Sequence, residues 1–526
     1  MPETVSQKSS IKKKLSFHQF FSFILSRAFV VGFLLVIEAA LVFLIINNFF
    51  GNSQYFYFFS MVFSVSVVVF IVSNKDNPNY KLAWSILILL LPPMGAIIYL
   101  FSGKRTMSRM KKLQIKTASQ KTAALLGQDK LTWQKVRRLP ADTFQQINYL
   151  KTENNFAIYQ KTETKYLPVG ERFFDELKKE LRKAKKFIFL EFYIIQEGIM
   201  WDSVLEILKE KVAEGVEIRL MYDDVGCLFT LPTNYVKRMN SYGIKTQVFN
   251  RFRPILDMQM NNRDHRKIVV VDGKVGFVSG INLADEYINA YPKHGHWKDT
   301  GVMLKGDAVW SLTVMYLQFW NAYYRHGDSN YLDYKVKTPA NIKDDGYVQP
   351  FCDSPEDDEL VSKNVILNAI NKAVKYIYFT SPYLIIDNEL ITALSNAAKN
   401  GVDVRIITPG IGDKWYVHYL TQSFYAQLIE AGVKIYEYLP GFIHAKSFLA
   451  DDQIGMVGTI NMDYRSLYLQ FECGVLMYKS IALRQLKDDL LKTMDESELI
   501  SLYQVNEVKL LTRITRGILR VFAPLV

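Results

Sequence analysis

The chain begins with long apolar runs and continues as a body in which short apolar segments alternate with amphipathic ones. Residues 28–49 and 55–73 are two nearly uninterrupted apolar runs. Each is long enough for a helix that crosses a bilayer, which takes about 20 residues. A third apolar run, residues 84–101, is interrupted by Pro92 and Pro93. We expect this broken run to span the membrane, re-enter it or lie along its interface.

Basic residues flank these apolar runs and indicate their orientation, because cytoplasmic flanks carry an excess of Lys and Arg. The basic flanks consist of Lys8, Lys12, Lys13, Lys14, Arg27, Lys75, Lys81, Lys104, Arg105, Arg109, Lys111 and Lys112. Two crossings keep all of them on one side, whereas three would place the last group outside. We therefore predict that residues 1–110 form a hairpin of two membrane spans followed by the Pro-broken run. The rest of the chain would then lie on the cytoplasmic side of the cell membrane.

The body after these runs contains an internal repeat. AKKFIFLEFYI from Ala184 resembles AVKYIYFTSPYLI from Ala373, and HRKIVVVDGKVGFVSGIN from His265 resembles HAKSFLADDQIGMVGTIN from His444. Three further blocks match in the same order. The body is therefore predicted to be a duplicated domain.

Each copy alternates Lys-rich helical segments with β-branched and aromatic runs of strand length. This pattern is typical of α/β domains, in which helices cover a buried sheet. We predict a first lobe over residues 111–335, a polar linker over 336–346 and a second lobe over 347–505. Residues 506–526 would form a basic amphipathic helix that lies in an anionic membrane interface, or packs on the body instead.

Both copies carry the motif His-x-Lys-x4-Asp-x6-[Ser/Gly]-[Gly/Thr]-x-Asn. In the first copy the motif residues are His265, Lys267, Asp272, Ser279, Gly280 and Asn282. In the second copy they are His444, Lys446, Asp451, Gly458, Thr459 and Asn461. The chain has only seven histidines, so two identical constellations headed by histidine argue against a chance match.

The motif residues suit chemistry at a phosphodiester. Alternate positions of a strand project to one face, so the His and Lys of each motif should project together. Two motifs facing each other would place two lysines against the non-bridging oxygens of a phosphate. One neutral histidine can attack phosphorus while the other, protonated, donates to the leaving alkoxide. The substrate-binding hydrogen bonds are expected from Asn282, Asn461, Ser279 and Thr459.

This pattern resembles the phospholipase D superfamily. The resemblance implies an α/β/α sandwich for each lobe, an active site at the lobe interface and a covalent phosphohistidine, with no metal or other cofactor. It assigns His265 as the nucleophile and His444 as the general acid and then the base. Asp299 and Glu472, late in each repeat, are expected to orient the histidines. Asp272 and Asp451 complete the catalytic motifs, although a structural role suits them better.

Further segments are similar to the family of bacterial cardiolipin synthases. They are WSILILLLPPMGAIIYLFSGKR, TSPYLI and the ending RGILRVFAPLV. The resemblance implies that a phosphatidyl group passes from one phosphatidylglycerol to another, releasing glycerol. It implies phosphatidylglycerol and anionic membrane lipids as partners and no nucleic acid, and a homo-oligomer is compatible with it.

Composition narrows the possible classes of function but does not select a single one. The formal net charge of +12 favours an anionic partner. Three cysteines without a CxxC spacing indicate a reducing compartment. The alternatives that stay open are a membrane-bound phospholipase D hydrolase and a transferase with another alcohol acceptor. A nuclease or a non-catalytic basic scaffold fits less well.

Overall fold

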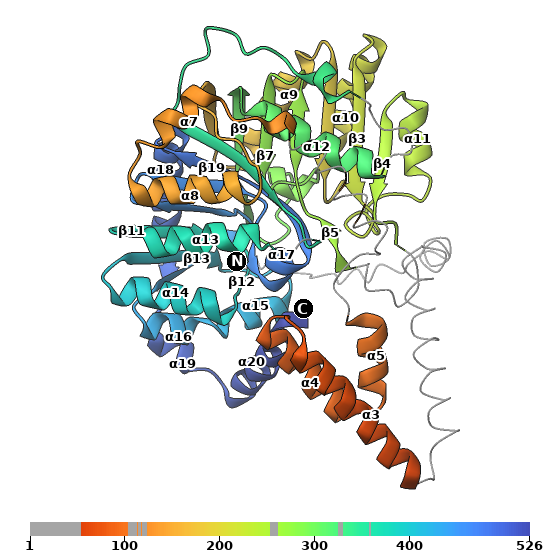
Figure 1. Cartoon of the computed structure of the whole chain (residues 1–526), viewed down its shortest axis with the longest axis vertical. Coiled ribbons are helices and arrows are strands. Elements are labelled where there is room, and N and C mark those ends of the chain that lie inside the picture. The colour runs from red at the N-terminus through yellow and green to blue at the C-terminus, as the bar shows by residue number, and fades with distance from the viewer. Residues whose placement is uncertain are drawn as a thin grey trace, which may run out of the picture. The chain divides into compact units, whose positions relative to one another are not determined.

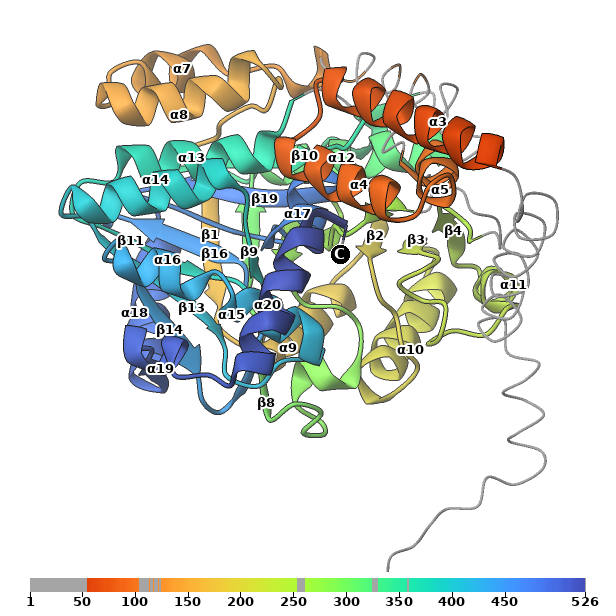
Figure 2. The same cartoon turned by 90° about the horizontal axis from the view of Figure 1, so that it is seen from below.

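The fold is described from a computed structural model of the whole chain (Figures 1 and 2). The structure describes residues 54–103, 124–252, 261–323, 330–356 and 359–525, together with positions 113, 117 and 122. Its sheets belong to one compact unit, Phe58–Phe252 with Asp257–Val526; the first turn of α3 belongs to a separate unit.

Two sheets repeat the same strand order, which confirms the predicted duplication and the α/β class. The first sheet has the order β1-β9-β7-β6-β2-β3-β4, and the second has β10-β19-β17-β16-β11-β13-β14-β20. The first sheet comprises β1 (Thr162–Leu167), β9 (Gly301–Gly306), β7 (Val275–Ser279), β6 (Ile268–Val271), β2 (Phe187–Phe192), β3 (Glu217–Asp223) and β4 (Lys245–Phe249). The second comprises β10 (Tyr347–Asp353), β19 (Gln470–Tyr478), β17 (Ile454–Gly458), β16 (Ser447–Ala450), β11 (Tyr376–Thr380), β13 (Asp403–Pro409), β14 (Lys434–Tyr438) and β20 (Ser497–Leu499).

Helices cover the sheets. The first lobe has α9 (Gly170–Arg182), α10 (Ile199–Ala213), α11 (Tyr235–Ser241) and α12 (Val309–Tyr323). The second has α13 (Val361–Lys372), α14 (Asn388–Lys399), α15 (Trp415–Gln422), α16 (Tyr425–Glu430), α17 (Tyr464–Tyr468), α18 (Ile481–Asp495) and α19 (Leu502–Asn506). Along β2, Ile188 and Leu190 pack into the core with α9 and α10, whereas Phe189 faces the core that contains α12. This alternation follows from the two-residue period of a strand buried on both faces.

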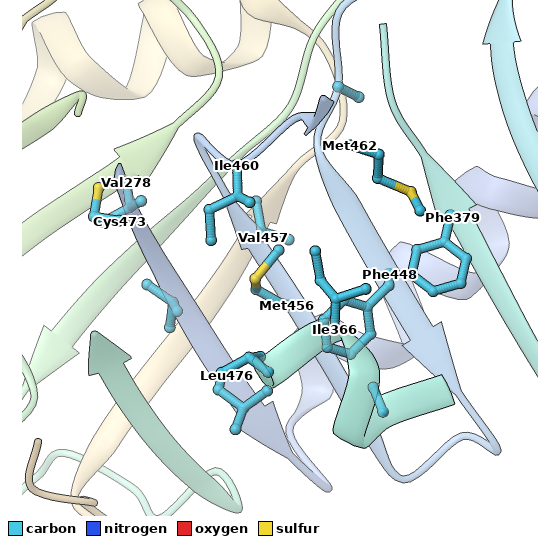
Figure 3. Close-up of a cluster of buried hydrophobic side chains, with 14 of the residues drawn as sticks. Val278, Ile366, Phe379, Phe448, Met456, Val457, Ile460, Met462, Cys473 and Leu476 are labelled. Atoms are coloured by element: carbon cyan, nitrogen blue, oxygen red, sulfur yellow. The ribbon is translucent and has the colours of Figure 1, made fainter. Parts of the chain in front are cut away.

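The two lobes share one continuous hydrophobic core. Val278 of β7 in the first lobe lies beside Cys473 of β19 in the second, next to Val457 and Met456 of β17 (Figure 3). Burial of apolar surface contributes about 25 cal/mol per Å², so a shared core holds the lobes in a fixed arrangement. Helices α7 (Lys130–Val136) and α8 (Ala141–Thr152) belong to this arrangement too (Figure 1). Although they precede the first sheet and fall within the predicted first lobe, Gln146 of α8 donates to the carbonyl of Val365 on α13.

Two short parallel strand pairs cross between the lobes. β5 (Arg263–Asp264) pairs with the start of β19, and β8 (His296–Lys298) pairs with β15 (Gly441–Ile443). Each pair thus joins the residues before a motif histidine in one lobe to the residues before an acidic residue in the other. These pairings set the register of the site described below.

The first described helices carry the predicted second and third apolar runs. α3 spans Gln54–Ser73, α4 spans Pro78–Leu90 and α5 spans Met94–Ser102. The predicted break at Pro92 and Pro93 is confirmed, because it separates α4 from α5. The two helices pack closely: a Cβ at Gly95 would lie 2.7 Å from the Cα of Ile88.

The predicted two-span hairpin stays a prediction. Its first run, residues 28–49, lies outside the described residues. Within the part of the chain that the structure describes, no helix combines the length and the apolar character that a bilayer crossing requires.

The C-terminal segment forms the predicted amphipathic helix, α20 (Leu510–Phe522), which lies beside α15 (Figures 1 and 2). Two of its three arginines face the protein: Arg520 donates to the carbonyl of Ser423 at 3.0 Å, and Arg516 donates to Gln422. Of the two alternatives for this segment, Arg516 and Arg520 therefore follow the second, packing on the body. Its apolar side chains are exposed instead, namely Leu510, Leu511, Ile514, Ile518 and Val521.

Candidate active site

The two motif histidines lie where strands cross between the lobes. The backbone N–H of His265 donates to the carbonyl of Phe471 at 3.0 Å, and that of His444 donates to the carbonyl of Lys298 at 2.6 Å. Both histidines are almost fully buried. The predicted strand positions are wrong in one respect: β6 and β16 begin only after the lysines, so each His-x-Lys segment lies just before its strand.

Each histidine is hydrogen-bonded to a carboxylate of the opposite lobe. The Nδ1 atom of His265 lies 2.9 Å from Oε1 and 3.1 Å from Oε2 of Glu472. The Nδ1 atom of His444 lies 2.5 Å from Oδ2 of Asp299. When the acid is ionised it can only accept, so Nδ1 then carries the hydrogen and Nε2 is left for a substrate. The structure thus brings together the predicted histidines and acids, but pairs them across the lobes.

Neighbouring groups hold the two carboxylates in place. The hydroxyl of Ser466 donates to Oε1 of Glu472 at 2.6 Å, and the hydroxyl of Thr459 donates to Oε2. Asp299 instead accepts from the backbone N–H of Thr300 at 2.8 Å. Ser466 was not among the predicted site residues, because it follows the second motif on a separate helix, α17. Thr459, predicted to bind substrate, contacts the orienting carboxylate instead.

The two motif lysines are buried beside the histidines. The Nζ atom of Lys267 donates to the carbonyl of His265 at 2.6 Å, and Lys446 donates in the same way to the carbonyl of His444. Burial lowers the pKa of Lys267 to about 8 and that of Lys446 to about 7. An incoming phosphate would favour their charged forms, because opposite charges stabilise one another most where water is excluded.

Burial also sets the protonation of the histidines and their acids. It lowers the pKa of His265 well below the usual value, and the nearby Lys267 and Lys446 lower it further. The pKa of His444 is lowered for the same reasons. Burial raises the pKa of Asp299 to about 7 and that of Glu472 to about 8, against the attraction of the lysines. Before substrate binds, both imidazoles are therefore held neutral, as a nucleophile must be.

Aromatic rings enclose the histidines. The ring of Tyr193 lies edge-on to His265 with centroids 5.2 Å apart. Around His444 lie Tyr287 at 5.4 Å, Trp297 at 5.6 Å and Phe442 at 5.8 Å. These rings exclude water from one side of the site. The sequence could have indicated the position of Trp297, because neighbouring residues of a strand point to opposite faces. In β8, Trp297 therefore points away from the side of His296 and Lys298.

The motif aspartates do not take part in this cluster, which corrects their place among the catalytic residues. The carboxylate of Asp272 accepts hydrogen bonds from the backbone N–H groups of residues 185–187, at the start of β2. Asp451 accepts equivalent bonds from residues 374–376, at the start of β11. Each lies beyond the far end of the strand that follows its histidine. Both aspartates therefore fix the start of a central strand, β2 in the first sheet and β11 in the second.

The remaining predicted substrate-binding residues are buried near the motifs. Asn282 accepts from the backbone N–H of Ile194 at 3.0 Å and donates to the hydroxyl of Tyr287 at 2.7 Å, so its amide is engaged within the protein. Ser279 makes a long hydrogen bond, 3.4 Å, to the carbonyl of Ile281. The side-chain oxygen of Asn461 is buried without a hydrogen-bond partner among the described residues. Asn461 is therefore the better candidate for a contact with substrate.

Comparisons with known proteins agree with this arrangement. The family profile described as "Cardiolipin synthase, PLD-like domain" matches residues 177–291 and 366–494, which contain both motifs. A second profile, "Phospholipase_D-nuclease N-terminal", matches residues 62–104. The solved phosphatidylserine synthase of Haemophilus influenzae covers 72% of this chain and 97% of its own, with a TM-score of 0.54 and 15% identity. This likeness supports the fold.

Two relatives cover most of the chain. An uncharacterized protein of Streptococcus mutans is 41% identical over 88% of this chain and 100% of its own length. A cardiolipin synthase of Halalkalibacterium halodurans is 32% identical over 89% of this chain and 93% of its own length. With two matched motifs and paired histidines at the lobe interface, the chain belongs to the cardiolipin synthase family of phospholipase D-like proteins.

Proposed function

We propose that this protein transfers a phosphatidyl group from one phosphatidylglycerol to another, giving cardiolipin and glycerol. The observation that carries this proposal is the pair of buried His–carboxylate dyads with two lysines between the lobes. Membership of the cardiolipin synthase family selects the lipid substrate from the phosphodiesters that such a site could process.

In the first half-reaction, Nε2 of neutral His265 attacks the phosphorus of the donor lipid. Lys267 and Lys446 offset the charge on the non-bridging oxygens. The negative phosphate raises the low pKa of His444, which then carries a proton and gives it to the departing glycerol oxygen. The P–O bond to glycerol breaks as the P–N bond forms. Asp299 stabilises the imidazolium of His444, and Glu472 holds His265 in the reactive tautomer.

In the second half-reaction His444 acts as the base, and His265 is the leaving group. Neutral His444 takes the proton of the terminal hydroxyl of a second phosphatidylglycerol. That oxygen attacks the phosphohistidine, and the P–N bond to His265 breaks. The aromatic rings around His444 limit the access of water, which would otherwise give phosphatidic acid.

We further propose that the protein works at a membrane through both ends of the chain. The predicted two-span hairpin would anchor it with its catalytic body in the cytoplasm. The exposed apolar side of α20 would lie in the interface, where burial of about 0.8 kcal/mol per CH₂ favours insertion. Because Arg516 and Arg520 bond to the body, the helix would be held at a fixed angle to it.

The test is a reaction of the purified full-length protein with phosphatidylglycerol in mixed micelles, without added metal and with products separated by mass. We expect cardiolipin and glycerol in equal amounts, and neither from the His265→Ala or His444→Ala variants. Phosphatidic acid with glycerol would instead make water the acceptor and the protein a hydrolase. If the folded protein gave no turnover, the assignment of phosphatidylglycerol as its substrate would be contradicted.

A further inference from the structure

A small pocket in the second lobe adjoins the active site without containing either histidine. It encloses about 100 Å³. Its lining comes from the segment after β11, the start of α15, the start of α17 and the C-terminal turn after α20. The residues are Tyr383, Ile385, Lys414, Tyr416, Val417, Asp463, Tyr464, Arg465 and Ala523.

Contacts along the wall of this pocket lead to the reacting groups. The ring of Tyr383 lies 6.4 Å from that of Phe442, which in turn lies 5.8 Å from His444. Burial raises the pKa of Asp463 to about 6, and the charges of Arg465 and Lys446 act against this rise. Asp463, which lines the pocket, is thus near enough to Lys446 for the two charges to interact.

Two cations line the pocket without a carboxylate partner. Lys414 and Arg465 are both exposed, and within the part of the chain that the structure describes neither side chain forms an ion pair. The acids at the pocket bond to neutral donors: Asp463 accepts from the backbone N–H of Ser466 at 2.8 Å, and Asp413 accepts from the hydroxyl of Tyr383 at 2.9 Å. The pocket thus combines two exposed cations, Lys414 and Arg465, with the buried carboxyl group of Asp463.

The second half-reaction requires a second anion site. The acceptor lipid carries its own phosphodiester, separated from the reacting hydroxyl by the three carbons of glycerol. While the phosphatidyl group is bound to His265, Lys267 and Lys446 are occupied by its oxygens. Other cations near the site would then stabilise the acceptor's charge and position its phosphate.

We propose that Lys414 and Arg465 bind the phosphate of the acceptor phosphatidylglycerol, so that its terminal hydroxyl reaches the phosphohistidine. This inference rests on the proposed function and names the acceptor subsite of that reaction. Arg465 offers a planar pair of donors to the phosphate and Lys414 a compact charge. The apolar Ile385, Val417 and Ala523 lie where the lipid's glycerol backbone would follow.

The surroundings of the pocket suit a molecule that enters from a membrane. Trp415, next to Lys414, is 66% exposed, and its ring contacts Tyr419 at 5.9 Å. Exposed tryptophan is favoured at a membrane interface. Ala523 belongs to the turn after α20, whose apolar side is exposed. A lipid at that surface would meet the pocket before the histidines.

The experiment compares the two half-reactions in the full-length Lys414→Gln/Arg465→Gln variant. Incorporation of labelled glycerol into phosphatidylglycerol reports formation and reversal of the phosphatidyl enzyme, and needs no lipid acceptor. Cardiolipin formation from the same micelles needs the acceptor. We expect cardiolipin formation to fall at least about tenfold, with a higher KM for phosphatidylglycerol, while glycerol exchange stays within about twofold. Arg465→Lys with native Lys414 keeps the charge but loses the planar pair of donors, so it should retain more synthesis than the double variant and less than the native protein.

A matched control removes the same charge elsewhere: Lys399→Gln/Arg484→Gln changes two exposed cations that do not line the pocket. Both half-reactions should be unchanged in it. A parallel loss of exchange and synthesis in Lys414→Gln/Arg465→Gln would overturn the acceptor assignment, as would synthesis at the control's rate. If the native protein exchanges glycerol but makes no cardiolipin, the proposed function fails, and the acceptor subsite with it.

Discussion

The two His–carboxylate dyads are built from equivalent elements but use different side chains. Glu472 contacts His265 through both oxygens and accepts from two hydroxyl groups. Asp299 contacts His444 through one oxygen and accepts from a backbone N–H. The shared fold therefore fixes where a carboxylate must be, but it does not fix how the carboxylate is held.

The difference extends to the motif position packed behind each acid. Gly280 occupies in the first lobe the place that Thr459 occupies in the second. A Cβ at Gly280 would lie 2.2 Å from Oδ1 of Asp299, whereas Thr459 donates its hydroxyl to Glu472. The glycine and the shorter acid fit together, as do the threonine and the longer acid. Each lobe has thus reached the same geometry with a different matched pair.

The sharpest test of the comparison is which histidine becomes phosphorylated. We expect His265→Ala and His444→Ala each to lower kcat by about 10³-fold or more, as removal of a nucleophile or its acid does in other enzymes. A quenched reaction of His444→Asn with labelled donor lipid should leave label on His265. Label on residue 444 in the His265→Asn variant instead would exchange the roles of the lobes.

Neutralising the acids should have the next largest effect. Asp299→Asn and Glu472→Gln keep the shape of the side chain but favour the wrong imidazole tautomer, so we expect kcat to fall about 10²–10⁴-fold. Circular dichroism would check that both variants are folded. If only one of them lost activity, the dyads would not be equivalent in mechanism.

Substitutions of the residues packed behind the two acids should lower activity by different amounts in the two lobes. Gly280→Thr forces Asp299 away from His444, and we expect a loss of at least about 10²-fold. Thr459→Val removes one hydrogen bond to a buried carboxylate, worth about 1.5–3 kcal/mol, or about 10–100-fold in rate. Thr459→Ser should retain activity. Equal losses in Gly280→Thr and Thr459→Ser would contradict the matched pairs.

The lysines predict how activity depends on pH. Burial lowers the pKa of Lys446 to about 7 and that of Lys267 to about 8, so both lose their positive charge as the pH rises through this range. Free enzyme then binds phosphate less well. Because Asp299 and Glu472 ionise over the same range, the fall in kcat/KM should become visible above about pH 8, where both acids are charged. Bound phosphate favours the charged lysines, so kcat should fall less. A flat kcat/KM up to pH 9 would contradict this.

The motif aspartates should separate stability from catalysis. Asp272→Ala leaves three backbone N–H groups without their acceptor, so we expect a loss of about 1–3 kcal/mol in unfolding free energy. Asp451→Ala should cost less, because the Asp451 side chain is only partly buried, whereas Asp272 is buried. Activity per folded molecule should change little in either variant. Denaturant unfolding and assays on the same samples would measure both quantities.

The duplication, the α/β class and the motif residues could be predicted from the sequence, because repeats and spacing are local properties. The pairing of His265 with Glu472 and of His444 with Asp299 could not, since it depends on how one lobe faces the other. The role of Thr459 was missed for a related reason: the residue that it contacts is not fixed by spacing. Asp272 and Asp451 share the motif because the fold requires them.

Because each histidine pairs with an acid of the other lobe, neither half of the gene encodes a complete active site. A fragment ending in the linker would carry one histidine and the acid that serves the other, so it could complete a site only with a second fragment. Co-expressed halves would then restore activity where neither does alone. Recombination between relatives at the linker would separate both histidines from their acids at once, so such hybrids would survive only where the crossed partners match.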